Sequence, residues 1–121
     1  MLECAKTNKD YNCFLNPDTK LPMMHVDDAV DASIKLMMIE KSNISINYPY
    51  NINSFETSPH DWFRTIKSLG FNFNLNYKVD FRQKIADSWP KKIDDSILRN
   101  DINWKPNFDL LETAKNVLKL M

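Results

Sequence analysis

The stretch that decides the fold is residues 21–41, LPMMHVDDAVDASIKLMMIEK, because its hydrophobic periodicity changes part-way along. Met23–Val26 is short and mostly apolar, which predicts a strand. Asp27 and Asp28 offer N-caps for a helix that runs to about Lys41. The apolar positions of this helix are Val30, Ile34, Met37 and Met38, widened by Ala29, Leu36 and Ile39. A strand leading directly into an amphipathic helix indicates an α/β fold.

The rest of the sequence continues to alternate short strand and helix patterns. The clearest helix begins at Ser58, which can cap it, with Pro59 suited to its first position and Gly70 to its end. Residues 82–90 show no periodicity and are expected to be irregular. The other expected elements are helices at Met1–Asn8, Asp94–Asn100 and from Asp109 onward, and strands at Tyr11–Leu15, Tyr50–Asn53 and Phe71–Tyr77. So few short strands are typical of part of a larger domain.

Composition excludes several classes of function. The 121 residues are 43% hydrophobic and 26% charged, which is ordinary for a globular protein. The 16 basic and 16 acidic side chains cancel, so no excess of positive charge supports binding to nucleic acid. Gly70 is the only glycine, whereas a loop that cradles phosphates needs two or three. The chain alone is therefore expected to bind no dinucleotide cofactor.

The remaining composition signals concern compartment and metals. No stretch approaches the roughly 18 apolar residues of a membrane span, and the charged start does not resemble a secretory signal. Cys4 and Cys13 have no CxxC or histidine companions, so they are expected to be reduced thiols rather than zinc ligands. We expect a cytoplasmic protein, or one of the mitochondrial matrix if the source is eukaryotic, without a membrane partner.

Three stretches resemble one family of enzymes. Residues 18–29, DTKLPMMHVDDA, resemble the strand-to-helix segment of extended short-chain dehydrogenases of the NAD-dependent epimerase/dehydratase superfamily. Trp104-Lys105-Pro106 resembles the closing W-x-P of the same superfamily. Residues 80–90, DFRQKIADSWP, are more specific and closely resemble the short-chain type of NAD-dependent L-threonine 3-dehydrogenase. The likeness runs over nearly the whole chain and corresponds to the C-terminal portion of such an enzyme.

The resemblance implies an α/β fold that combines the end of a Rossmann-type sheet with a small substrate lobe. Residues 1–56 would supply the last elements of the NAD-binding domain, and residues 57–121 the substrate-binding lobe. The helix after Asp27 and the strand at Tyr50–Asn53 would pack on the nucleotide-binding sheet. The family oxidises the 3-hydroxyl of L-threonine in threonine catabolism, passes hydride to NAD and forms 2-amino-3-oxobutyrate. The implied partners are L-threonine, the N-terminal NAD-binding half and a second copy in a homodimer.

The family's catalytic residues have no counterpart in this chain. Its glycine-rich turn and Tyr-x-x-x-Lys pair belong to the N-terminal portion, and no tyrosine here is followed by lysine at the fourth place. No catalytic or cofactor-binding residue is therefore assigned, and we expect the chain to be inactive by itself. Two alternatives stay open: the C-terminal lobe of a sugar-nucleotide epimerase or dehydratase, and a non-enzymatic remnant. Leu21 occupies the place of an arginine that epimerases use on phosphates, which disfavours a diphosphate substrate.

The substrate-binding candidates all lie in the most specific stretch. Trp89, which precedes a proline, is expected to close over the substrate and exclude water, or alternatively to pack between lobes. Arg82 could pair with the threonine carboxylate, or form a surface ion pair with Asp80 or Asp87. Asp87 and Ser88 could orient the segment through bonds to the backbone.

Other polar residues are expected to be structural. His25 lies in an apolar stretch and is expected to be buried and hydrogen-bonded, while His60 is expected to face solvent. The acidic residues Asp27, Asp28 and Asp31 suit the first turn of a helix better than a metal site. No metal is therefore expected.

Overall fold

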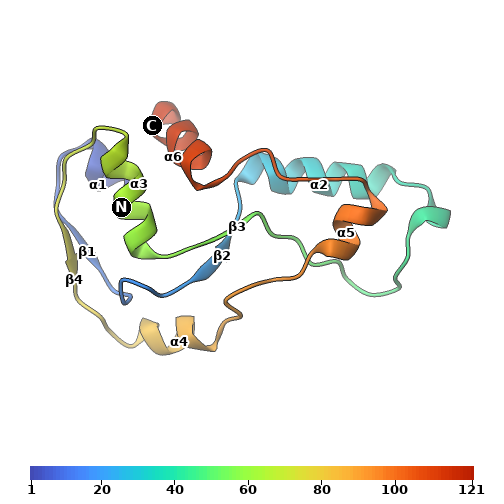
Figure 1. Ribbon diagram of the computed structural model, residues 1–121, viewed down its shortest axis with the longest axis horizontal. Coiled ribbons are helices and arrows are strands. Elements are labelled where there is room, and N and C mark those ends of the chain that lie inside the picture. The colour runs from blue at the N-terminus through green and yellow to red at the C-terminus, as the bar shows by residue number, and fades with distance from the viewer.

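The computed structural model describes residues 1–121 as helices joined by short strands and long connections in an elongated molecule (Figure 1). This arrangement confirms the α/β fold class. The helices are α1 (Leu2–Lys6), α2 (Val26–Met38), α3 (Pro59–Ser68), α4 (Arg82–Ser88), α5 (Ser96–Asp101) and α6 (Leu110–Leu120), with a 3₁₀ turn η1 (Lys41–Asn43). The strands are β1 (Tyr11–Cys13), β2 (Leu21–Met23), β3 (Phe55–Thr57) and β4 (Leu75–Tyr77). No helix is both long enough and apolar enough to cross a membrane.

The strands form two small sheets rather than one. β1 runs parallel to β4, with Tyr11 opposite Leu75, and β2 runs antiparallel to β3, with Leu21 opposite Thr57. β1 and β2 lie within residues 1–56, whereas β4 lies within residues 57–121 and β3 ends at residue 57. Each sheet therefore pairs a strand of the first range with a strand that lies in, or reaches into, the second. The expected division of the chain between residues 56 and 57 stays a prediction.

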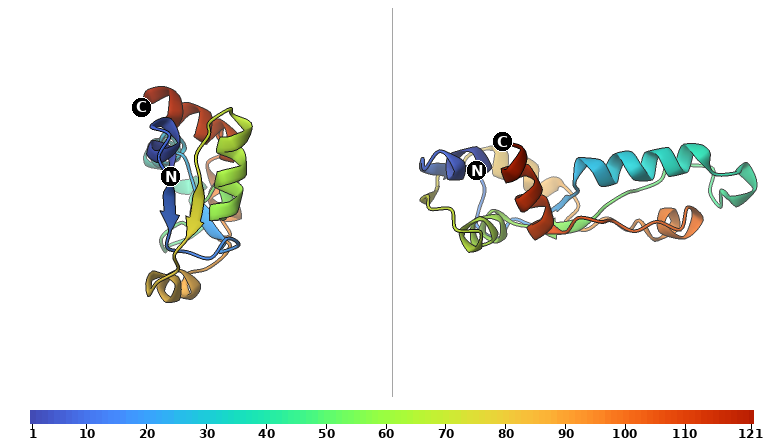
Figure 2. Two further views of the ribbon diagram at one scale, coloured as in Figure 1. Left: turned by 90° about the vertical axis from the view of Figure 1, so that its left-hand side faces the viewer. Right: turned by 90° about the horizontal axis from the view of Figure 1, so that it is seen from above.

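The core consists of three small clusters, and only 20 of 121 residues are buried, so little apolar burial stabilises the chain. At one end of the molecule α1, α3 and α6 gather, and at the other α2 lies with α5 (Figure 2). The clusters are Ala5, Ile66, Phe73 and Leu118; Cys13, Leu15 and Ala86; and Ala32, Leu98 and Trp104.

Helix α3 begins and ends as its sequence predicts. The Ser58 hydroxyl accepts the backbone N–H of Asp61, and the Asp61 carboxylate accepts the Ser58 N–H in return, which is a complete capping box. Pro59 occupies the first turn. Gly70 follows the helix with φ +89°, a conformation that a residue without Cβ adopts readily.

The start of α2 differs from its prediction. The strand ends at Met23, and His25 rather than an aspartate caps the helix, because its Nδ1 accepts the Asp27 N–H at 3.1 Å. Asp28 is fully buried and accepts hydrogen bonds from the segment that precedes α6. The helix ends at Met38, where the chain becomes extended, instead of reaching Lys41.

All four predicted strands differ from the structure in position or length: the strand expected at Met23–Val26 is Leu21–Met23, and the one expected at Tyr11–Leu15 ends at Cys13. Tyr50–Asn53 forms no strand, because no second strand lies beside it, and Phe55–Thr57 pairs with β2 instead. The expected strand at Phe71–Tyr77 is reduced to Leu75–Tyr77, because its partner β1 offers only three residues. Strand formation requires a neighbour, which the alternation of side chains alone does not reveal.

The prediction of an irregular segment at residues 82–90 is also wrong. Residues 82–88, RQKIADS, form α4, and the Asp80 carboxylate accepts the Arg82 N–H at 3.0 Å. The helix is too short to show a helical period, although it contains good helix formers and no glycine. It ends at Ser88, and Pro90 holds the following residue, Trp89, in an extended conformation (ψ 150°).

Several large apolar residues are exposed. On α6, Ala114 and Leu118 are buried, whereas Leu111 and Met121 are exposed. The methionines Met23, Met37 and Met38 are exposed as well. The apolar stripe of α2 is thus present in the sequence but unpartnered in this chain.

Candidate functional site

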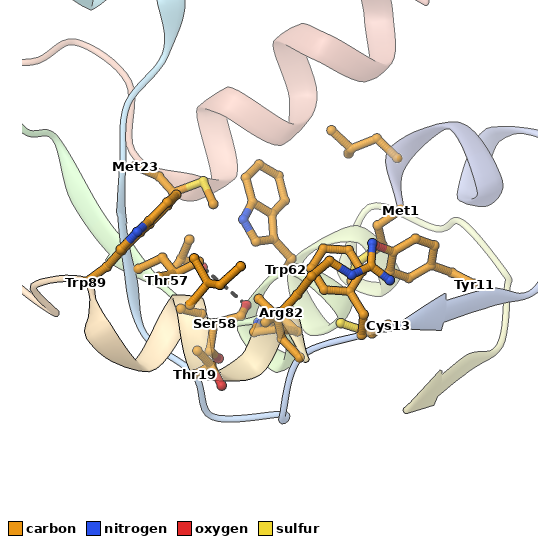
Figure 3. Close-up of a pocket in the computed structure, with 17 residues that line it drawn as sticks. Met1, Tyr11, Cys13, Thr19, Met23, Thr57, Ser58, Trp62, Arg82 and Trp89 are labelled. Atoms are coloured by element: carbon orange, nitrogen blue, oxygen red, sulfur yellow. Dashed lines mark hydrogen bonds between the residues drawn. The ribbon is translucent and has the colours of Figure 1, made fainter. Parts of the chain in front are cut away.

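A pocket of about 510 Å³ lies where α4 approaches β1, β2 and the start of α3 (Figure 3). Its walls are mostly apolar and aromatic, from residues such as Tyr11, Phe14, Leu21 and Trp62. Among the four predicted site residues, Arg82 and Trp89 line this pocket. An apolar pocket with few polar groups is the usual form of a small-molecule site.

Trp89 stands at one end of the pocket, directly after α4. Figure 3 shows its ring near Met23, while Arg82 lies toward Tyr11. Trp89 is 56% exposed, so it is not a core residue of this chain. The seven residues of α4 separate Trp89 from Arg82 by about 10 Å along the helix axis, so the two side chains approach the pocket from opposite ends.

Arg82 has both a charged and an aromatic partner. Its guanidinium stacks on the Phe14 ring, 3.5 Å from the ring centre, and its Nη2 donates to Asp80 at 2.6 Å. This ion pair lowers the pKa of Asp80 and raises that of Arg82, chiefly through the hydrogen bonds between the two side chains. The surface pair expected for Arg82 is therefore present with Asp80. The Nη1 group donates no hydrogen bond within the chain, so it is free to donate to an anion.

Asp87 and Ser88 lie on α4 but do not line the pocket. Asp87 accepts a hydrogen bond from Gln83 Nε2 at 2.6 Å, and the Ser88 hydroxyl donates to the Ile85 carbonyl at 2.7 Å. Ser88 therefore bonds to the backbone as expected, and Asp87 bonds to a side chain instead. Both residues lie in the last turn of α4, directly before Trp89, and their hydrogen bonds stabilise that turn.

Gln83 is an important residue that the sequence did not identify. It is buried, and its Oε1 accepts the backbone N–H of Asn16 at 2.8 Å and the hydroxyl of Thr19 at 3.2 Å. These bonds fix α4 against the turn that follows β1, and Thr19 itself lines the pocket. The partners are 64 and 67 residues away in sequence, so no local pattern could have revealed them.

The pocket holds further polar atoms but no catalytic pair. Tyr11 lines it, and burial is the main cause that raises the pKa of its hydroxyl. Ser58 also lines it, although its hydroxyl is engaged in the capping box. No three histidine, cysteine or acidic side chains lie together in a way that could hold a metal ion. The pocket is thus suited to binding an organic molecule with an anionic group at Arg82.

The remaining candidates have structural surroundings. His25 is buried, stacks on Phe108 at 4.0 Å and lies 3.2 Å from the Asn116 side-chain oxygen, which confirms its structural role. His60 is exposed as predicted. Cys4 and Cys13 are free thiols.

No protein-family model matches the chain. The mitochondrial L-threonine 3-dehydrogenase of Sus scrofa is 39% identical over 115 residues, which are 94% of this chain and 31% of that protein. An uncharacterized epimerase/dehydratase of Staphylococcus haemolyticus is 36% identical over 90% of this chain and 35% of its own length. The chain therefore spans about a third of these curated relatives.

Solved structures of L-threonine dehydrogenases also match nearly all of this chain and less than half of their own length. The GalE-like L-threonine dehydrogenase of Cupriavidus necator superposes with a TM-score of 0.93 at 36% identity. The match covers 98% of this chain and 43% of that one. The fold of this chain is thus found within longer dehydrogenases, as the resemblance of residues 80–90 implied.

Proposed function

The chain is homologous to the C-terminal portion of L-threonine 3-dehydrogenases and epimerase/dehydratases, and we propose that it forms the substrate-side part of an NAD-dependent L-threonine 3-dehydrogenase. In this proposal the complete enzyme oxidises the 3-hydroxyl of L-threonine and passes hydride to NAD. This chain contributes binding and orientation of the amino acid, and the chemistry requires the portion of the enzyme that it does not cover.

The residues present do not form an NAD site. Gly70, the only glycine, ends α3 and is not part of a loop at a helix N-terminus that could cradle phosphates. The chain has no Tyr-x-x-x-Lys pair to act on a hydroxyl. The cofactor therefore belongs to the other portion of the proposed enzyme.

The observation that carries the proposal is that Arg82 and Trp89 line one pocket. Arg82 is already oriented by Asp80 and Phe14, and its free Nη1 can donate to the carboxylate of an amino acid. Trp89 covers the opposite end and would limit the access of water to the reacting carbon. Asp87 and Ser88 are positioning residues, because they act through Gln83 and the last turn of α4.

A nucleotide-sugar substrate is the second candidate, since an epimerase/dehydratase is 36% identical. A diphosphate normally requires several cations, and Arg82 is the only cationic side chain that lines the pocket. The single cation therefore favours a small zwitterion as the substrate.

Both cysteines are free and the Sus scrofa relative is mitochondrial, so we place the enzyme in the cytoplasm or the mitochondrial matrix. The homodimer stays a prediction.

The test uses a chimera in which this chain replaces the matched portion of the Cupriavidus necator enzyme. We expect the chain alone to form no NADH from L-threonine, and the chimera to form it. In the chimera, Trp89→Ala should lower kcat about 100-fold through loss of positioning, equal to about 2.7 kcal/mol, without changing the affinity for NAD. Arg82→Gln should raise KM for threonine.

The control is Lys84→Gln, which removes an exposed cation from the same helix outside the pocket. This variant should leave both kinetic constants unchanged. NADH formation by the chain alone would contradict the proposal. A chimera that acts on a nucleotide sugar but not on threonine would support the second candidate, and a folded chimera without either activity would indicate a non-enzymatic chain.

A further inference from the structure

The pocket beside α4 is larger and more apolar than a threonine molecule requires. Its volume of about 510 Å³ lies in the range that holds drug-sized organic ligands, which are much larger than threonine. Of its 17 lining residues 12 are hydrophobic, and they include Phe14, Trp62 and Trp89. A threonine bound at Arg82 would therefore leave most of these walls uncovered.

The uncharged hydroxyl groups of Thr19, Ser58 and Thr57 already have partners. The Thr19 hydroxyl exchanges hydrogen bonds with the Gln83 side chain at 3.0 and 3.2 Å. The Ser58 hydroxyl donates to Asp61, and the Thr57 hydroxyl donates to the Ser58 carbonyl at 3.5 Å. No acidic side chain lines the pocket, so an ammonium group would find no carboxylate on these walls. The walls therefore complement an uncharged, apolar body.

One end of the pocket, in contrast, carries a positive charge. Arg82 stacks on Phe14, and its Nε and Nη2 donate to Asp80, so the free Nη1 is held in a fixed orientation. Tyr11 lies toward the same end (Figure 3). Burial raises the pKa of the Tyr11 hydroxyl, so the hydroxyl stays protonated at neutral pH and can also donate. This end therefore suits a carboxylate.

The opposite end of the pocket is apolar. Trp89 and Met23 lie together there, and Trp62 lies between them and Arg82 in the view of Figure 3. Arg82 and Trp89 are about 10 Å apart along α4. A chain of about eight carbons matches that distance, because three single bonds of an extended chain advance about 3.6 Å. The pocket therefore has the shape and charge for a long molecule with one anionic end.

We propose that this pocket is also a binding site for an apolar monocarboxylate, such as a medium-chain fatty acid. Its carboxylate would lie on Arg82 and its hydrocarbon chain would run along α4 toward Trp89. This ligand class goes beyond the proposed function, because threonine lacks the apolar surface to cover these walls. Burial of the hydrocarbon chain supplies the affinity. The carboxylate would also compete with threonine for Arg82, and only this competition rests on the proposed function.

Titration of the chain with octanoate, followed by NMR of the tryptophan indole N–H groups, tests the site. The Trp62 and Trp89 signals should shift and saturate with a Kd of about 1 mM or below. The Trp104 signal is an internal control and should not move, because its N–H donates to Asp31 in another cluster. Affinity should rise about fourfold with each methylene from hexanoate to octanoate. Octylammonium, which has the same chain and the opposite charge, should bind at least about 10-fold more weakly.

Two variants of the chain separate the charge from the apolar wall. Arg82→Gln should lower the affinity for octanoate about 10-fold and remove the preference over octylammonium. Ile85→Ser shortens a pocket side chain that is 50% exposed, so the fold should persist while the affinity for octanoate falls several-fold. Lys84→Gln, which removes a cation from the same helix outside the pocket, is the matched control and should bind octanoate unchanged.

Three results would overturn the proposal. A Trp104 shift as large as those of Trp62 and Trp89 would mean that octanoate coats apolar surfaces in general. Equal affinity of Arg82→Gln and the unaltered chain would mean that the carboxylate does not use the guanidinium. Loss of octanoate binding in the chimera, measured by calorimetry, would mean that the additional portion of the enzyme occupies the pocket.

Kinetics of the chimera report separately on the proposed function. Octanoate should raise the KM for threonine without changing kcat, because the two carboxylates share Arg82. A chimera that binds octanoate through Arg82 but is not inhibited would contradict the role of Arg82 toward threonine and leave the monocarboxylate site supported. A chimera that binds octanoate and does not oxidise threonine would contradict the proposed function and support the site in the same way.

Discussion

Replacing Asp28 by alanine should destabilise the chain more than any nearby surface change. This carboxylate has no exposed area and lies in the first turn of α2. Its Oδ1 accepts the Asn107 N–H at 2.9 Å and the Asn107 side-chain amide at 3.2 Å, and its Oδ2 accepts the Phe108 N–H at 3.0 Å. Asp28 therefore joins α2 to the segment before α6.

The magnitude follows from the groups that would lose their acceptor. Alanine leaves two backbone N–H groups unpaired, and each unsatisfied buried donor costs about 1–3 kcal/mol. The Asn107 side chain is exposed and can bond to water instead. Some water can also reach the gap left by the carboxylate. We expect a loss of about 3 kcal/mol in the free energy of unfolding.

Urea unfolding followed by circular dichroism measures the effect. Asp27→Ala is the matched control, because Asp27 is exposed and its loss should cost no more than about 0.5 kcal/mol. Since 3 kcal/mol is a large fraction of the stability of a small domain, Asp28→Ala could already be unfolded in buffer. That result counts as agreement only when Asp27→Ala stays folded. Equal unfolding free energies of the two variants would refute the reasoning.

Two further predictions concern backbone strain and pH. Gly70→Ala should cost about 1 kcal/mol in urea unfolding, because φ is +89° although no atom lies within 4 Å of the added Cβ, and equal stability would contradict this account. The hydrogen bond from the Tyr50 hydroxyl is the main cause that lowers the pKa of Asp101 in the folded chain. The ionised carboxylate therefore stabilises the fold at pH values above its ordinary pKa of about 3.9. This stabilisation is lost as the pH falls through the lower pKa that Asp101 has in the folded chain. Amide exchange in residues 45–53, corrected for its intrinsic pH dependence, should therefore accelerate below about pH 4, and Tyr50→Phe should reduce this acceleration.

Local chemistry explains which elements could be predicted. The start and end of α3 depend on Ser58, Pro59, Asp61 and Gly70, which lie within or next to the helix they delimit. Helix α6 likewise begins at Asp109, whose carboxylate accepts the Glu112 N–H. Helix α4 has no side-chain cap of this kind, and only Gln83 and Ala86 are buried along it, so its sequence carried no comparable signal.

The candidate site was predicted in part. Arg82 and Trp89 were identified from the resemblance of residues 80–90, and the structure shows that both line one pocket. Their roles toward threonine stay predictions. Gln83 and the aromatic partner Phe14 were not identified, because their contacts join segments more than 60 residues apart.

The sequence by itself determined the α/β class, the capped helices and the absence of a phosphate-cradling loop, because each depends on residue type and short-range spacing. It also determined the apolar stripe of α2. Tertiary structure alone decided that this stripe is exposed and that Tyr50–Asn53 forms no backbone–backbone hydrogen bond. The physical reason is that an apolar face and a strand are completed only by a partner surface, and the partner is not specified by the pattern that requires it.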